Sequence, residues 1–174
     1  MNNNDILIRL RYALDIKNTD MVEIFKLGGI DVTKDDVIKI LTKPKDIYDD
    51  EDYYYDDLTE DEEYIKCTNS MVESFLNGFI TFKRGKQEPR PGQPDAHPPT
   101  KSKESVNNIL LKKVKIALSL TSEDMLDIFE KAGITVTKGE LGAILRKEGH
   151  KNYKQCLDKY ARNFLKGLAI RYRV

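Results

Sequence analysis

The chain has 174 residues, of which 40% are hydrophobic and 33% charged, and its 29 basic residues balance its 29 acidic ones. This composition suits a water-soluble chain with one ordinary core or two very small ones. It contains no run of the ~20 apolar residues that span a bilayer, and its start, Met1-Asn2-Asn3-Asn4-Asp5, lacks the features of a secretion signal. We therefore expect a cytoplasmic protein whose two cysteines remain thiols.

The first two predicted helices follow one another closely. Apolar side chains recur at helical spacing over about residues 4–16, and Asn4 stands where an N-cap is expected. A second helix over about residues 19–28 carries apolar residues on one side. Gly29 then stands where a left-handed residue would end that helix.

The third and fourth predicted helices are separated by an acidic segment. The third opens with a capping box formed by Thr33 and Asp36. Residues 46–63 then hold 11 acidic residues, no basic ones and four tyrosines. This segment is either a solvated loop or a strap whose tyrosines contact a basic surface of the protein. In the fourth helix Gly78 costs about 1 kcal/mol relative to alanine, which predicts that another backbone packs closely there.

The second half of the chain repeats the first. At an offset of 104 residues, 16 of 40 aligned positions are identical, and beyond the acidic segment the offset becomes 89, so that Gly167 matches Gly78. Five of the six prolines lie between the copies, which predicts a flexible linker. We therefore predict an all-α fold with a first helical repeat at residues 1–84, a linker at 85–104 and a second repeat at 105–174. The two four-helix units are expected to pack as a pseudo-dimer, because each alone has a small core.

The two halves carry opposite charges. Residues 1–84 have a net charge of −8 and residues 105–174 a net charge of +7, and without residues 46–63 the first half would be +3. The halves either attract each other or face different partners.

No catalytic, cofactor-binding or metal-binding residues are predicted. His97 and His150 have no partner at metal-ligand spacing. Cys67 and Cys156 occupy matching positions and are best interpreted as buried thiols, although a thiol enzyme centred on Cys156, with His150 close in space, remains a third hypothesis. Enzyme activity is therefore disfavoured.

Basic residues are the remaining candidates for contacts with a polyanion. They flank the apolar stripe of the first helix of each copy, follow the fourth helix or close the chain. These candidates are Arg9, Arg11, Lys83, Arg84, Lys113, Lys115, Arg171 and Arg173. Such residues bind phosphates, or they stabilise helix C-termini, where the helix dipole favours cations.

Several motifs resemble the bacterial YehS-like family of unknown function. They lie in both copies, outside the acidic segment and outside the linker except for its first two residues. The motifs are Asn4-Asp5-Ile6-Leu7, Arg11-Tyr12, Ser74-Phe75-Leu76-Asn77-Gly78, Lys83-Arg84-Gly85-Lys86, Asn107-Asn108-Ile109, Leu111-Lys112-Lys113, His150-Lys151-Asn152 and Phe164-Leu165-x-Gly167-Leu168-Ala169. The resemblance implies a bacterial cytosolic setting and a tandem architecture, and it transfers no catalytic residues.

The expected function is a non-enzymatic binding or regulatory module. We expect a protein partner, no membrane partner and no cofactor. The alternative is a nucleic-acid-binding protein that uses the basic residues of the first helices and the lobe ends.

Overall fold

A computed structural model describes residues 2–42, 65–85, 104–147 and 149–173, and all regular structure within these ranges is α-helical. The predicted all-α fold is thereby confirmed. The acidic segment 46–63 lies outside the described residues, as does the predicted linker apart from Gly85 and Glu104.

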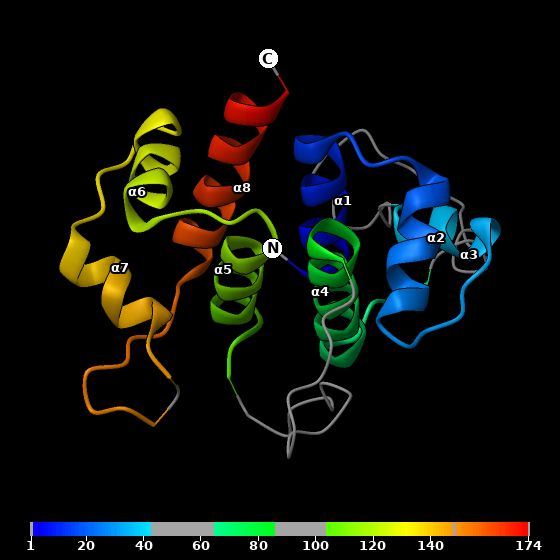
Figure 1. The fold of residues 1–174 in the computed structure, drawn as a ribbon, viewed down its shortest axis with the longest axis horizontal. Helices are drawn as coiled ribbons and strands as arrows, with labels where there is room; N and C mark the ends of the chain where they lie inside the picture. Colours follow the sequence, from blue (N-terminus) through cyan, green and yellow to red (C-terminus); the bar gives the residue numbers. More distant parts are fainter. Residues whose placement is uncertain (1, 43–64, 86–103, 148, 174) are drawn as a thin grey trace, which may run out of the picture.

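Eight helices follow one another in these ranges (Figure 1). The first lobe contains α1 (Asn3–Leu14), α2 (Asn18–Leu27), α3 (Lys34–Ile40) and α4 (Asn69–Arg84). The second lobe contains α5 (Val106–Ala117), α6 (Ser122–Lys131), α7 (Lys138–Leu145) and α8 (Asp158–Tyr172). The second lobe thus repeats the element order of the first at the offsets that the sequence comparison uses.

Local capping signals place the helix ends. The predicted capping box of Thr33 and Asp36 begins α3, and Gly29 follows α2 in the left-handed region, at φ +94°. The prediction that Asn4 caps the first helix is wrong, because the side chain of Asn2 accepts the N–H of Asp5 at 2.8 Å. Asn4 lies in the first turn and is only 2% exposed, and its side-chain amide forms hydrogen bonds inside the lobe.

This buried asparagine ties three segments of the first lobe together. Its Nδ2 donates to the carbonyls of Ile40 at 2.7 Å and Ile65 at 2.8 Å, and its Oδ1 accepts the N–H of Cys67 at 2.9 Å. Asn108 repeats all three bonds in the second lobe, to Ile144, Lys154 and Cys156 at 3.0, 3.0 and 2.8 Å. Buried backbone groups that would otherwise lack partners are thereby satisfied in both lobes.

In each lobe a glycine lets two helices approach closely. A Cβ on Gly78 in α4 would lie 1.9 Å from the carbonyl oxygen of Ile24 in α2, and a Cβ on Gly167 in α8 would lie 2.0 Å from that of Ile128 in α6. The predicted close approach is therefore confirmed at both glycines. Around these contacts the core is filled mainly by aliphatic side chains and phenylalanines, of which Phe25 and Phe75 meet edge to face at 4.9 Å.

The lobes meet through two pairs of helices. In Figure 1, α1 lies beside α8 and α4 lies beside α5, and both pairs are in contact. Since α1 corresponds to α5 and α4 to α8, exchanging the lobes turns one pair into the other. This is the packing expected of a pseudo-dimer with an approximate two-fold axis. We call the two contacts the α1–α8 joint and the α4–α5 joint.

Candidate functional site

Two of the predicted polyanion contacts instead connect the lobes. The guanidinium of Arg173, just beyond α8, donates to the carbonyl of Tyr12 at 3.1 Å and stacks 4.1 Å from the centroid of its ring. Arg84, at the equivalent position of α4, donates to the carbonyl of Ile116 at 3.2 Å. Each arginine therefore places its charge at the C-terminal turn of a helix in the other lobe, where the helix dipole favours a cation.

Other predicted cations have partners within their own surroundings. Arg171 forms ion pairs with Asp124 at 3.2 Å and with Asp127 at 3.7 Å. Lys83 is exposed at the end of α4, 6.0 Å from the ring centroid of Phe79.

Three more predicted cations are half-buried. Arg11 in α1 and its counterpart Lys115 in α5 are partly covered by the fold. Lys113 is half-buried at the α4–α5 joint, where burial lowers its pKa while the charges of Glu73 and Glu104 raise it. Desolvation outweighs the two carboxylates, so the pKa of Lys113 is lowered overall.

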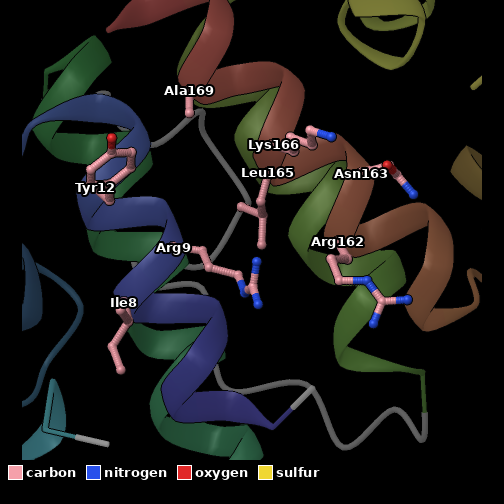
Figure 2. A pocket seen from close by; sticks show the side chains of 8 residues that line it. All are labelled: Ile8, Arg9, Tyr12, Arg162, Asn163, Leu165, Lys166 and Ala169. Carbon is pink, nitrogen blue, oxygen red and sulfur yellow. The ribbon is translucent and has the colours of Figure 1, made fainter. Parts of the chain in front are cut away.

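Arg9 differs because it lines a groove at the α1–α8 joint. The groove has a cavity volume of about 570 Å³, and helical spacing brings one face of each helix to it. It is lined by Ile8, Arg9 and Tyr12 of α1 and by Arg162, Asn163, Leu165, Lys166 and Ala169 of α8. In Figure 2, Arg9 extends from α1 into the gap before α8, with Leu165 and Arg162 on the α8 side of that gap.

The groove is strongly cationic. Arg9, Arg162 and Lys166 contribute three positive charges, and none of the eight lining residues is acidic. Among the ion pairs of the described ranges, none involves these three side chains. Arg162 does interact electrostatically with Asp158. The pKa of Asp158 is lowered chiefly by a hydrogen bond from Asn107, and the charge of Arg162 contributes to the same shift. An anion entering the groove would therefore meet cations that form no ion pair with the described residues.

The groove also has an apolar base and an exposed aromatic rim. Leu165 is 2% exposed between the helices, whereas Tyr12 is 58% exposed at the end of α1. Tyrosine and arginine around an apolar centre are the residues that carry most binding energy at protein interfaces.

Sequence reasoning identified Arg9 and missed Arg162 and Lys166. The signal was present in the repeat, because at an offset of 89 residues Arg162 and Lys166 align with Glu73 and Asn77 of the first copy. Where two copies of a repeat differ in charge at aligned positions, the surfaces formed by those positions differ in charge as well.

Both cysteines lie in the core beneath the duplicated asparagines. Burial raises the pKa of each thiol to about 12, and at Cys156 the charge of Asp158 adds to this. The Cys156 Sγ lies 3.7 Å from the carbonyl oxygen of Leu157. His150 is exposed, and its Nδ1 accepts the N–H of Asn152 at 3.0 Å.

Neither a metal-binding cluster nor a membrane-spanning helix occurs in the described part of the chain. No cluster of three or more histidine, cysteine, aspartate or glutamate side chains there is arranged to hold a metal ion. None of its helices combines the length and the apolar character needed to cross a membrane.

Comparisons with known proteins agree with the resemblance found in the motifs. A family model described as "Protein of unknown function (DUF1456)" matches residues 3–85 and 107–173. The uncharacterized protein YehS of Escherichia coli (strain K12) is 37% identical over 176 residues, an alignment that covers 100% of this chain and 98% of that protein. No solved structure matches the chain. The two matched segments fall on the two lobes, and the chain belongs to the DUF1456 family of proteins of unknown function.

Proposed function

We propose that this protein is a non-enzymatic binding module that holds an acidic segment of a partner protein in the groove at the α1–α8 joint. The observation that carries the proposal is the set of three cations, Arg9, Arg162 and Lys166, around a cavity of about 570 Å³ with an apolar base. That volume lies within the range of ordinary ligand sites. Carboxylates on the segment would pair with the cations, and an apolar side chain would cover Leu165.

An acidic protein segment fits this surface better than a nucleic acid does. Nucleic-acid binding rests on many phosphate contacts along a continuous basic track. Arg84, Arg171 and Arg173 would extend such a track, but their guanidinium groups already bind carbonyls or carboxylates of the chain. The remaining cations form a compact cluster beside an apolar base, which suits a short segment with both charged and apolar side chains.

The proposal also assigns no catalysis to the thiols. A cysteine nucleophile acts as the thiolate, and burial with a pKa of about 12 keeps Cys67 and Cys156 protonated at neutral pH. A reduced, cytoplasmic setting is part of the same proposal.

The test is a titration with a short synthetic peptide that alternates glutamate and leucine. The control ligand is the same peptide with glutamine at every glutamate position. We expect binding of the acidic peptide only, weakened by Arg9→Ala and unchanged by Lys26→Ala, which removes an exposed cation of α2 outside the groove. Equal affinity of the parent and Arg9→Ala would overturn the assignment of the groove. A single-stranded oligonucleotide that binds more tightly than the acidic peptide, and depends on Arg9, would replace the protein partner by a nucleic acid.

A further inference from the structure

The two joints between the lobes are built from matching residues but carry different charges. At the α4–α5 joint the residues equivalent to Arg9 and Arg162 are Lys113 and Glu73. An anion and a cation on opposite helices of one joint are thus replaced by two cations at the other. Position 73/162 is therefore the aligned pair at which the sign of the charge reverses between the two joints.

The α4–α5 joint carries charges of both signs. Glu73 of α4 is 7% exposed, and although burial lowers the pKa of Lys113 on the facing helix, the charge of Glu73 opposes that shift. Lys112 pairs with Glu104 and lies 5.5 Å from the ring centroid of Tyr153. A buried carboxylate beside cations of the same chain offsets part of the cost of their desolvation, and this joint therefore already contains an anion of its own.

The α1–α8 joint lacks its own carboxylate at that place. Arg162 stands where Glu73 would be, Lys166 stands where Asn77 would be, and Arg9 keeps the cation of the facing helix. The groove remains open there, and its cations form no ion pair with the described residues. Compared with the α4–α5 joint, a guanidinium replaces the carboxylate at one aligned position and a lysine replaces an asparagine at the other.

We infer that Arg162 determines which joint binds a ligand, and that a ligand carboxylate takes, between Arg9 and Arg162, the place that Glu73 holds against Lys113. This inference rests on the proposed binding of an acidic segment and specifies its recognition. The ligand presents a glutamate or aspartate side chain to the two guanidinium groups, which bind carboxylates through paired N–H donors. The α4–α5 joint is the closed counterpart and serves to hold the lobes together.

The experiment reverses the charge at the divergent position. Arg162→Glu places a carboxylate opposite Arg9, so the joint should satisfy itself as the α4–α5 joint does. We expect the affinity for the glutamate–leucine peptide to fall at least about tenfold, which corresponds to about 1.4 kcal/mol. Arg162→Gln should cause a smaller loss, because it removes one cation without adding a competitor. Glu73→Gln, a neutral change of similar shape, should leave the peptide affinity unchanged.

Melting temperatures provide a second readout that does not depend on the ligand. Arg162→Glu should raise the melting temperature of the free protein, and adding Arg9→Ala should abolish that gain, because the new carboxylate then loses its partner. If the parent binds no acidic peptide, the proposed function fails, but this gain still tests the equivalence of the joints. Unchanged peptide affinity in Arg162→Glu, or a melting temperature that falls independently of Arg9, would overturn the inference.

Discussion

Replacing Gly78 by alanine tests the packing of α2 against α4 quantitatively. A Cβ at this position would lie 1.9 Å from the carbonyl oxygen of Ile24 and 2.7 Å from the amide nitrogen of Gly28. Both contacts are with backbone atoms of the neighbouring segment, so no side-chain rotation relieves them and the helices must separate.

The two opposing effects differ in size. Alanine gains about 1 kcal/mol of helix propensity over glycine, whereas overpacking costs about 1–3 kcal/mol, with the upper end expected for a clash between backbones. We therefore expect a net destabilisation of about 2 kcal/mol at the upper end of that cost. For a chain of this size it corresponds to a fall of about 4–8 °C in the melting temperature. Gly167→Ala should behave in the same way, because its Cβ would lie 2.0 Å from the carbonyl oxygen of Ile128.

The matched control is Gly142→Ala in α7. Its Cβ would meet nothing within 4 Å, so only the propensity gain remains and the melting temperature should rise. Thermal unfolding followed by circular dichroism measures all three variants in one experiment. Melting temperatures of Gly78→Ala and Gly167→Ala at or above that of the parent would refute the close-approach argument.

Three further predictions follow from the core and the charge distribution. Asn108→Ala should lower the free energy of unfolding by about 3 kcal/mol or more, because it leaves a buried N–H and two carbonyls without partners. Urea unfolding measures this, with Asn163→Ala, which removes only an exposed hydrogen bond within α8, as a nearly neutral control. Cys67 and Cys156 should resist alkylation at neutral pH until urea unfolds the chain. Burial raises the pKa of both thiols from 9.0 to about 12. The stability that the protonated thiols contribute should therefore be complete below pH 9.0 and lost as the pH rises towards about 12. An alkaline unfolding transition that does not change in Cys67→Ala or Cys156→Ala would contradict the second half of that prediction. Deleting residues 49–63, a segment with 10 acidic residues and no basic ones, should increase retention on heparin at low salt through the change in net charge; equal retention would contradict this.

Helix positions and close contacts were predictable wherever a local signal determines them. The capping boxes at Thr33 and Thr137 depend on residues three positions apart, and Gly78 is conspicuous because glycine is costly inside a helix. Gly28 shows the limit of this reasoning. It reads as a helix end, yet a Cβ there would lie 1.9 Å from the carbonyl oxygen of Ser74. Nothing near Gly28 in the sequence indicates that α4 crosses at that point.

The candidate site was only partly predictable because it depends on which helix faces meet. Arg9 drew attention as one of several cations beside an apolar stripe, but the same criterion selected Arg84 and Arg173, whose guanidinium groups bind carbonyls of the opposite lobe. Arg162 was missed because the candidates were chosen from cations beside the apolar stripe of the first helix and at the lobe ends, and not from charge differences between the aligned copies. Its meaning becomes visible only when α8 is placed against α1 and compared with the equivalent joint.

The features that the two lobes share and those in which they differ have different explanations. Arg84 and Arg173 make the same bond across the interface in both directions, and Asn4 and Asn108 make the same three bonds inside each lobe. Both lobes need these interactions, because each must close its own core and both contribute to one interface. A single ligand needs only one opening. A charge change at only one of the two equivalent joints leaves the other joint to hold the lobes together. The arginine at position 162, where the aligned position of the first copy has Glu73, is such a change.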